Sequence, residues 1–510
     1  MYTFVVYLHF TAKSAIILMV MLMSKTKKFI KANVFKLVLF LTAVLAITIC
    51  SKCSPLYPLN NWDDPNCFFT VGKAVANGKI MYKDIYEQKG PVLYFIHTAA
   101  YAISHTSFIG IWLLEIIAAF FFLLFSYKML RFFASHKVIY CMPLIAALTY
   151  SSASFVGGDS AEEFCLPFLA YCIYTGICAI KDNRILSSFE CIVTGFSMAF
   201  VLFVKYTMMG FYIGFIVVFL MWYHEKKQAK ELLNCVLNVM KGFLLILIPL
   251  IVYFIYYNAF IDLVTVYFHD NLFLYKTETI NIPVLKQVIN VVIGAGSFAI
   301  NNPTGFLMSI FALIYIVKYT DKYIRIFFIG TLCSTLFFVY LGGRYYAYYS
   351  FIMNSFCALG IVGIKSLVKK RNFGRKSFAA VSIISSVLIL LTSRNLSLMR
   401  FETEDYPQYR FAKIISQKEN ASLLNYGFLD GGFYTVCDIT PDCRFFCELN
   451  IPYEPMYKEQ NDTVENALVD FVVTKDENLS SPNYKLVDEC KFPYGDGIST
   501  YYLYQKRWSE

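Results

Sequence analysis

Apolar runs long enough to cross a lipid bilayer recur through most of the chain, and short clusters of lysine and arginine separate them. A spanning helix needs about 20 mostly apolar residues, because the hydrocarbon core of a bilayer is about 30 Å thick. Apolar residues make up 58% of the sequence and charged residues 16%, which is low for a soluble domain. The pattern predicts a polytopic α-helical membrane protein, and it accounts for the net charge of +10 without a nucleic-acid partner.

The apolar runs predict about eleven transmembrane helices. They cover residues 34–50, 108–130, 138–155, 164–180, 185–204, 206–223, 232–257, 303–317, 326–341, 349–364 and 377–392. The basic residues in the connections decide which end of each helix faces the cytoplasm, because lysine and arginine are concentrated in cytoplasmic loops.

A shorter apolar run at residues 91–105 determines the topology. If it crossed the membrane, the cluster Lys128, Arg131 and Lys137 and every later basic cluster would lie outside. If it lies along the outer surface as an interfacial helix, those clusters lie inside, and the short outer connections carry almost nothing basic except Lys205 and Arg344. The second choice obeys the positive-inside rule. It predicts a transmembrane domain of residues 34–393 with outer loops at 51–107, 156–163, 261–302 and 342–349.

The two ends of the chain differ from this domain. Residues 1–33 are expected to be cytoplasmic, and residues 1–22 are either an extra hydrophobic segment or an extension upstream of a start at Met23. Residues 394–510 are polar, with proline turns and β-type runs at 468–474 and 499–504, which predict a small α/β domain on the outer face. Its cysteines could form two disulfides outside the reducing cytosol, and the pairing is open: Cys437, Cys443, Cys447 and Cys490.

The first outer loop carries the strongest functional signal. Residues 61–93 read NWDDPNCFFTVGKAVANGKIMYKDIYEQKGPVL and place Asp63, Asp64, Asp84, Glu87 and Lys89 between two apolar regions. Charge beside a membrane is costly unless it serves a site or reaches water. The loop therefore predicts a reaction centre at the membrane surface, and the alternative is a solvated connection.

Three other outer segments accompany it. Residues 156–163 read VGGDSAEE, an acidic turn, and residues 342–349 read GGRYYAYY, an arginine among tyrosines. The long loop 261–302 contains an apolar stretch at 284–299 that is re-entrant, interfacial or a weak span, and the interfacial alternative preserves the topology.

Outer carboxylates and outer cations together indicate a general base and a phosphate-binding group. Transfer of a sugar from a lipid phosphate needs both, because the acceptor hydroxyl must lose a proton and the leaving phosphate is anionic. The markers of several other chemistries are absent from the sequence: GxxxxGK[ST], HExxH, paired CxxC and GxSxG.

The first outer loop resembles that of bacterial GT-C-type glycosyltransferases that use polyprenyl-phosphate sugars, the group containing aminoarabinose transferases and protein O-mannosyltransferases. The resemblance rests on Asp64 opening a surface helix, on Gly78, on Tyr82-Lys83-Asp84 and on Lys89-Gly90-Pro91 leading into a second surface helix. VGGDSAEE resembles the second acidic motif of the group, and Arg344 matches the arginine of a late Arg-x-Tyr-x-His-Tyr element. Ala347 stands where many relatives have histidine.

The resemblance implies roles for single residues. Asp64 would be the general base, with Asp63 as the adjacent alternative, and Lys89 and Arg344 would hold the leaving phosphate. Glu162 and Glu163 would orient the acceptor or bind a divalent cation. Asp84, Lys205 and Tyr345 complete the predicted substrate-binding set.

Each role has a plainer alternative. Asp64 could cap its helix, Lys89 could extend its ammonium group to the membrane surface, and Arg344 could be a membrane anchor. Glu162 and Glu163 could stabilise the dipole of the next helix. The outer histidines, His97, His105 and His269, could be metal ligands but are more typical of polar tips at the headgroup level.

The favoured hypothesis is an integral-membrane glycosyltransferase that moves one sugar, with inversion, from a polyprenyl-phosphate donor to an acceptor hydroxyl on the outer face. Its expected partners are that donor, the bilayer and a glycan, lipid or protein acceptor, and a divalent cation is left open. A transporter or flippase of lipid-linked saccharides is the alternative, although it would favour charges at mid-membrane and broken helices. A membrane scaffold would leave the acidic loop without a role.

Overall fold

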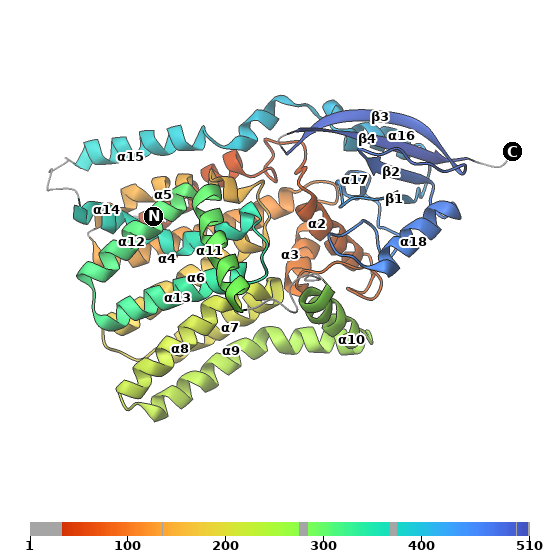
Figure 1. Cartoon of the computed structure of the whole chain (residues 1–510). Coiled ribbons are helices and arrows are strands. Elements are labelled where there is room, and N and C mark those ends of the chain that lie inside the picture. The colour runs from red at the N-terminus through yellow and green to blue at the C-terminus, as the bar shows by residue number, and fades with distance from the viewer. Residues whose placement is uncertain (1–32, 135, 275–283, 368–374, 496, 508–510) are drawn as a thin grey trace, which may run out of the picture.

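The computed structural model describes residues 33–134, 136–274, 284–367, 375–495 and 497–507. The predicted N-terminal segment before Asn33 lies outside the described residues. The chain forms a bundle of apolar helices, and the C-terminal domain lies at one end of that bundle (Figure 1).

The bundle contains the helix Asn33–Cys50 and the helices that follow the first loop. These are α4 (Ile109–Phe133), α5 (Met142–Tyr150), α6 (Ala161–Lys181), α7 (Ser188–Val204), α8 (Gly210–Glu225), α9 (Ala229–Tyr256), α11 (Val284–Asn301), α12 (Pro303–Tyr319), α13 (Lys322–Tyr340), η5 (Ala347–Leu359), α14 (Gly360–Leu367) and α15 (Arg375–Leu390). Most of them run side by side, whereas α11 lies across its neighbours (Figure 1).

The number of spans is smaller than predicted when it is judged by length and composition. Among the described residues, seven helices are long and apolar enough to cross a membrane, and nine if each of two bent pairs forms one span. Two further apolar helices, Lys137–Tyr150 and Ser188–Val204, are shorter. All eleven predicted runs are mainly helical, but the count of eleven is not reached because some of the helices are short or bent.

The apolar stretch at 284–299 forms α11, which meets α12 at an angle of 112°. The turn follows from local sequence, because Pro303 cannot continue a preceding helix and Asn302 caps the next one by accepting a hydrogen bond from the Gly305 N–H at 3.0 Å. Gly294 lets α11 pack on α13, since a Cβ there would lie 2.2 Å from Tyr340. This sharp turn is compatible with the interfacial and re-entrant alternatives.

The first loop forms two short helices, α2 (Asp63–Ala76) and α3 (Pro91–Tyr101), at the end of the bundle that carries the C-terminal domain (Figure 1). With 11 residues, α3 is about 16 Å long and too short to span a bilayer. It packs closely on α2, because a Cβ at Gly72 would lie 2.5 Å from the His97 Cβ. A non-spanning helix is what the distribution of basic residues predicts here.

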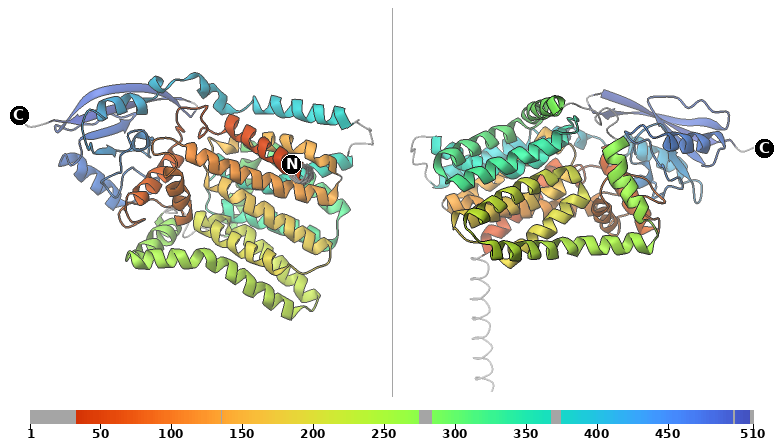
Figure 2. Two further views of the ribbon diagram at one scale, coloured as in Figure 1. Left: turned by 180° about the vertical axis from the view of Figure 1, so that it is seen from behind. Right: turned by 60° about the horizontal axis from the view of Figure 1, so that its bottom comes forward.

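The C-terminal domain contains a four-stranded sheet in the order β1-β2-β4-β3. Its elements are α16 (Pro407–Ile415), β1 (Leu423–Asn425), α17 (Phe433–Val436), α18 (Glu454–Glu465), β2 (Phe471–Lys475), β3 (Tyr484–Tyr494) and β4 (Gly497–Lys506). β1 pairs with β2 in parallel, and the other two pairs are antiparallel. Two further views show the sheet at one end of the bundle (Figure 2). The predicted small α/β domain is confirmed.

The two disulfides that the cysteines of this domain could form are absent from the described structure, where every cysteine is a free thiol. Cys443 contacts Thr463, with 3.6 Å between sulfur and oxygen, and Cys490 lies in β3. Cys447 instead faces Cys67 of α2, with 3.9 Å between the sulfur atoms. The spacing of cysteines along the chain does not bring their side chains within bonding distance.

The C-terminal domain is bound directly to the first loop by polar contacts. Lys73 of α2 is completely buried, donates to the Tyr434 carbonyl at 2.8 Å and pairs with Asp438 at 3.0 Å. The Arg444 guanidinium donates to the Tyr82 carbonyl at 2.7 Å. The first loop therefore lies between the bundle and the domain, and it is not the solvated connection considered as an alternative.

Candidate functional site

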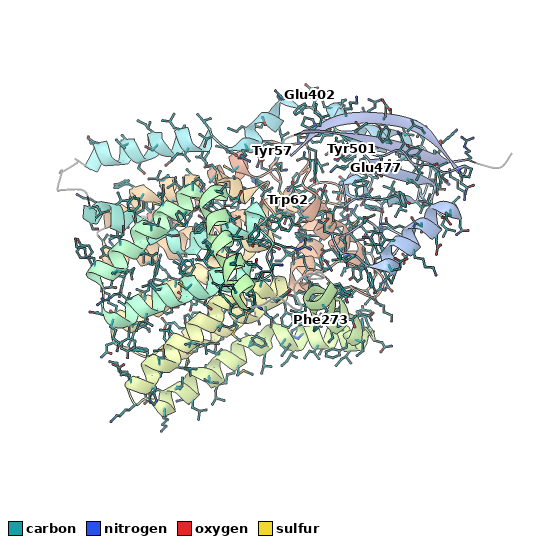
Figure 3. All side chains as sticks on the ribbon, in the orientation of Figure 1. Tyr57, Trp62, Phe273, Glu402, Glu477 and Tyr501 are labelled. Atoms are coloured by element: carbon teal, nitrogen blue, oxygen red, sulfur yellow. The ribbon has the colours of Figure 1, made fainter. Side chains whose placement is uncertain are left out.

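A cavity of about 210 Å³ lies where the start of α2, the approach to α3, the loop after α13 and the C-terminal domain meet. We call it the site cavity. Its lining includes three carboxylates, one lysine and four aromatic side chains: Asp63, Asp64, Glu87, Lys89, Trp62, Tyr346, Tyr348 and Tyr494. Figure 3 labels Trp62 at this boundary between the bundle and the domain, and Tyr501 on the sheet nearby.

Asp63 begins α2 and is almost completely buried, with 6% of its surface exposed. The Tyr494 hydroxyl of the C-terminal domain donates a hydrogen bond to Asp63 Oδ2. The Lys475 ammonium group lies 3.1 Å from the centroid of the Tyr494 ring. Burial raises the pKa of Asp63 to about 6, although the charge of Lys475 and the Tyr494 hydroxyl oppose the increase. A carboxylate with a pKa near neutrality suits proton transfer at ordinary pH.

Asp64 lines the same cavity and is half-buried. The N-cap of α2 is Trp62, which makes no side-chain cap, so both aspartates lie inside the first turn. The predicted capping role of Asp64 is therefore not present. Both carboxylates instead lie near the positive end of the α2 dipole, which favours their ionised forms.

Lys89 lines the cavity from the segment that leads into α3. Its ammonium nitrogen lies 3.8 Å from Glu87 Oε1 and 5.3 Å from the centroid of the Phe68 ring. Gly90 allows this approach, because a Cβ there would lie 2.0 Å from the Phe203 carbonyl oxygen. Pro91 then begins α3. The Lys-Gly-Pro sequence thus holds the lysine where the loop passes the end of α7.

A second cation lies behind the aromatic wall of the cavity. Lys205, at the end of α7, forms an ion pair with Glu162 and lies 3.9 Å from the centroid of Tyr349 and 5.0 Å from that of Tyr348. Tyr348 lines the cavity and packs on Trp62, with 5.2 Å between ring centroids.

Arg344 also reaches the wall indirectly. Its guanidinium donates to the Tyr346 hydroxyl at 3.2 Å, and Tyr346 lines the cavity and stacks on Tyr348 at 5.5 Å. Two of the predicted cations, Lys205 and Arg344, therefore contact tyrosines of the cavity and are absent from its lining.

Three predicted site residues lie elsewhere in the described structure. Asp84 accepts a hydrogen bond from the Ile80 N–H at 2.8 Å and so closes a turn of the first loop. The Tyr345 hydroxyl donates to Asn290 of α11 at 3.1 Å. Glu163 belongs to a separate buried cluster.

That cluster, which we call the carboxyl cluster, joins Glu115 of α4, Asp159 of the turn before α6, and Glu163 of α6. The Asp159 N–H donates to Glu115 at 2.8 Å and to Glu163 at 2.9 Å. His97 Nε2 lies 3.0 Å from both Asp159 carboxylate oxygens, and the Ser51 hydroxyl donates to Glu115 at 2.7 Å. The cluster ties α3, α4, α6 and the end of the helix Asn33–Cys50 together.

The cluster corrects one interpretation of the sequence. His97 is completely buried against Asp159, so it is neither a metal ligand nor a polar tip at the headgroup level. His105 and His269, with side chains 58% and 57% exposed, fit the second description. Within the described residues, no group of three or more His, Cys, Asp or Glu side chains is arranged to hold a metal ion.

Sequence reasoning missed residues of the carboxyl cluster and of the site cavity. Glu115 is the only carboxylate in its apolar run, which is a signal that could have been used. Tyr494 and Lys475 carried no such signal, because they are ordinary residues of a polar domain about 400 residues beyond Asp63.

Comparisons with known proteins give one family match and two similar solved structures. Residues 88–255 match the family described as dolichyl-phosphate-mannose-protein mannosyltransferase. The fold is similar to that of ArnT from Cupriavidus metallidurans bound to undecaprenyl phosphate, with a TM-score of 0.57 and 9% identity over 91% of this chain and 97% of that chain. The apo structure of ArnT gives a TM-score of 0.55 and 9% identity over 85% and 92%. No curated protein matches the sequence. The family match over residues 88–255 and the shared fold both support the GT-C-type superfamily to which the sequence motifs pointed.

Proposed function

We propose that this chain transfers a sugar from a polyprenyl-phosphate-linked donor to an acceptor hydroxyl at the end of the bundle that carries the C-terminal domain. The observation that carries the proposal is the site cavity, where the buried carboxylate of Asp63 and the ammonium group of Lys89 line one space. The glycosyltransferase superfamily, and a fold shared with a protein crystallised with undecaprenyl phosphate, support a lipid-linked donor.

In the proposed reaction, a carboxylate accepts the proton of the acceptor hydroxyl while that oxygen attacks the anomeric carbon of the sugar. The bond between the anomeric carbon and the phosphate oxygen breaks, and its electron pair leaves with the polyprenyl phosphate. Lys89 stabilises the negative charge that develops on the leaving phosphate. Attack and departure on opposite faces of the carbon invert its configuration.

Of the two adjacent aspartates, we propose Asp63 as the base, whereas the sequence favoured Asp64 with Asp63 as its alternative. Asp63 is the more buried and receives the Tyr494 hydrogen bond, and its pKa of about 6 lets it both accept a proton and release it. Asp64 lines the same cavity and is proposed to contribute charge there.

Glu162 and Glu163, which the sequence resemblance assigned together to orienting the acceptor, receive different roles. We assign to Glu162 the positioning of Lys205 behind Tyr348, and to Glu163 a structural role in the carboxyl cluster. Asp84 and Tyr345 are assigned structural roles by their hydrogen bonds. Lys205 and Arg344 extend the positive side of the site through the tyrosines that they contact.

The topology in this proposal has the site cavity on the outer face and a cytoplasmic N-terminus. The basic clusters of the connections support it, since they favour the opposite face. Residues 34–393 then form the transferase domain, and residues 394–510 form an outer domain that closes the cavity.

The test compares the cell-surface glycans of source cells with and without the gene, and then restores the gene as wild type, Asp63→Asn, Asp64→Asn or Asp462→Asn. Asp462 is an exposed aspartate of α18 and serves as the matched control. A general base contributes about 100-fold or more to rate, so Asp63→Asn should abolish restoration. Purified Asp63→Asn protein should still bind undecaprenyl phosphate.

The result that contradicts the proposal is full restoration by Asp63→Asn. Restoration by Asp63→Asn with loss by Asp64→Asn would move the base to the neighbour. Unchanged surface glycans in cells without the gene would contradict the transferase activity, and accumulation of lipid-linked sugar on the inner leaflet would favour the transporter alternative.

A further inference from the structure

A second, more open cavity, of about 620 Å³, is lined by Asp63 and by residues of the C-terminal domain, and it adjoins the site cavity. We call it the domain cavity. The two cavities share five lining residues: Asp63, Leu429, Leu449, Asn450 and Tyr494. The proposed base therefore lines both spaces, and Lys89 and the tyrosines Tyr346 and Tyr348 line the site cavity alone.

The two cavities differ in charge. The site cavity has Lys89 in its lining, as expected of a phosphate-binding space. Among the described residues that line the domain cavity, the charged ones are the carboxylates Asp63 and Glu448, and the others include Asn450 and Tyr457. Burial and the nearby charge of Glu477 raise the pKa of Glu448. A lining with acids and without cations disfavours a phosphate or another anion.

The same lining suits a sugar. Carboxylate and amide oxygens accept hydrogen bonds from hydroxyl groups, and the aromatic faces of Tyr457 and Tyr494 offer apolar surface beside them. The dimensions also fit, since small-molecule sites occupy about 300–1,000 Å³.

We propose that the domain cavity is the acceptor site, that it binds an uncharged, hydroxyl-rich saccharide, and that Tyr494 positions Asp63 between acceptor and donor. This inference rests on the proposed transferase function. It assigns the catalytic contribution of the C-terminal domain to two features, a binding cavity and one hydrogen bond.

The sheet explains how Tyr494 is held in place. Tyr494 ends β3 and pairs with Gly497 at the start of β4, so the β3–β4 hairpin carries its hydroxyl to Asp63. Lys475, at the end of β2, lies against the face of the Tyr494 ring. The hydroxyl donates to the ionised carboxylate, which favours the form of Asp63 that can accept a proton. Tyr494 is thus a positioning residue that acts through Asp63.

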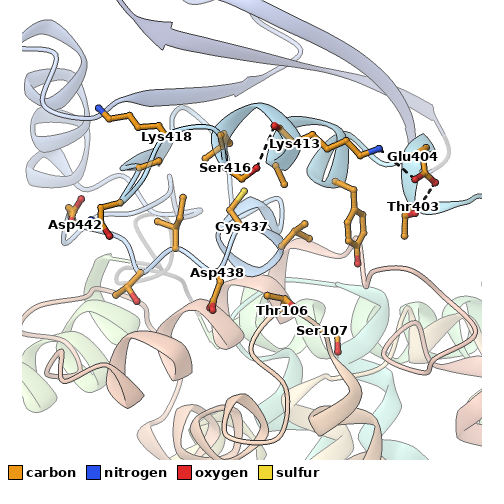
Figure 4. Close-up of a pocket in the computed structure, with 18 residues that line it drawn as sticks. Thr106, Ser107, Thr403, Glu404, Lys413, Ser416, Lys418, Cys437, Asp438 and Asp442 are labelled. Atoms are coloured by element: carbon orange, nitrogen blue, oxygen red, sulfur yellow. Dashed lines mark hydrogen bonds and ion pairs between the residues drawn. The ribbon is translucent and has the colours of Figure 1, made fainter.

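A larger cavity, of about 830 Å³, is a weaker candidate for the acceptor. It lies between the loop before α4 and one face of α16, and its residues include Thr106, Ser107, Lys413 and Asp438 (Figure 4). In the described structure it shares no lining residue with the site cavity. An acceptor bound there has no direct access to Asp63.

The experiment uses the full-length protein and four substitutions. Glu448→Gln and Tyr457→Ala alter the domain cavity alone, Tyr494→Phe removes one hydroxyl and keeps the ring, and Glu465→Gln is a control at an exposed glutamate of α18. Undecaprenyl phosphate is the probe for the donor side, measured as its Kd for each purified variant. Transfer is measured in membranes from cells without the gene, with the sugar identified by the glycan comparison, as a function of pH and of acceptor concentration.

Glu448→Gln and Tyr457→Ala should raise the acceptor KM about tenfold, with the Kd of undecaprenyl phosphate unchanged within twofold. Tyr494→Phe removes a hydrogen bond from the ionised form of Asp63, which should raise the pKa of that carboxyl group. The acidic limb of the pH–rate profile should therefore shift to higher pH by about one unit. A purely structural role for Tyr494 would lower the rate equally at every pH. Glu465→Gln should match the wild type.

Three outcomes would overturn the inference. An unchanged acceptor KM for both cavity variants means that the acceptor binds elsewhere. A weakened Kd for undecaprenyl phosphate in these variants assigns the domain cavity to the donor. An unshifted pH limb for Tyr494→Phe removes its positioning role. If the wild type neither binds the probe nor transfers sugar, the proposed function itself has failed, which is distinct from all three.

Discussion

The site cavity and the carboxyl cluster both gather acidic residues at the same end of the bundle, but their surroundings differ. In the site cavity, Asp63 and Asp64 face open space together with Lys89. In the carboxyl cluster, Asp159 is completely buried against His97 and its own backbone N–H bonds to both glutamates. The acids of the site cavity are therefore available to a ligand, whereas those of the carboxyl cluster form hydrogen bonds with other residues of the protein.

This difference shows that neighbouring acidic residues in a sequence motif need not serve the same function. Glu162 and Glu163 are adjacent in sequence, yet successive residues of a helix point about 100° apart. Glu162 pairs with Lys205 beside the site cavity, while Glu163 turns into the carboxyl cluster. Substitutions in the two regions should therefore separate effects on activity from effects on stability.

The largest expected effect is on stability, at His97. His97→Ala leaves Asp159 buried without its partner, which should lower the free energy of unfolding by about 3–5 kcal/mol. His105→Ala is the control, because its side chain is 58% exposed, and it should change stability by less than about 0.5 kcal/mol. Thermal unfolding of the purified proteins in detergent measures both. Equal losses would show that the carboxyl cluster is not a structural anchor.

The next effect is on activity, at Lys89. Lys89→Gln removes the cation of the site cavity and should reduce transfer about 100-fold, with weaker binding of undecaprenyl phosphate and little change in unfolding temperature. Lys83→Gln alters an exposed lysine of the same loop and should behave as wild type. Equal activity of the two variants would contradict a phosphate contact at Lys89.

The pH dependence of transfer should follow Asp63. Its burial raises the pKa to about 6, and the base acts only when ionised, so transfer should fall about tenfold for each pH unit below that value. Initial rates of transfer between pH 4.5 and 8 measure this acidic limb of the pH–rate profile. A rate independent of pH over this range would exclude Asp63 as the base.

The two neighbouring glutamates give the sharpest comparison. Glu162→Gln weakens the hold on Lys205 and should lower transfer about tenfold with a small change in stability. Glu163→Gln should cost about 1–3 kcal/mol of unfolding free energy, because it disturbs a buried hydrogen-bonded group, while the folded protein keeps its transfer rate. The reverse pattern would assign Glu163 to the active site.

Much of the fold is predictable from the sequence because hydropathy and basic clusters act locally. The apolar runs, the short helix at 91–105 and the α/β character of the C-terminal domain each follow from patterns within a few tens of residues. The count of eleven spans is not confirmed, because some of the apolar runs form helices that are short, such as Ser188–Val204, or bent. The two disulfides that the sequence allowed do not form in the described structure, where Cys447 packs against Cys67, a contact between distant segments.

The candidate site was predictable to the extent that it lies in one segment. Asp63, Asp64 and Lys89 come from the first loop, and the structure brings them to one cavity. Tyr494 could not be found, because its place depends on how the sheet docks against α2. Three predicted site residues instead form hydrogen bonds within the protein: Glu163, Asp84 and Tyr345. A sequence motif does not reveal the direction in which a side chain points.

The smallest expected effect is at Arg344, and it tests how far the positive side of the site extends. The half-buried Arg344 is not among the residues that line the site cavity, and its guanidinium donates to the Tyr346 hydroxyl of the cavity wall at 3.2 Å. A charge at the rim of a site acts weakly. Arg344→Gln should therefore weaken binding of undecaprenyl phosphate about threefold, an effect that high salt reduces further. Arg400→Gln, at an exposed arginine outside the cavity lining, should leave binding unchanged. A 100-fold loss at Arg344 would mean that the arginine reaches the phosphate directly when the donor binds, and that the loop after α13 moves toward Lys89.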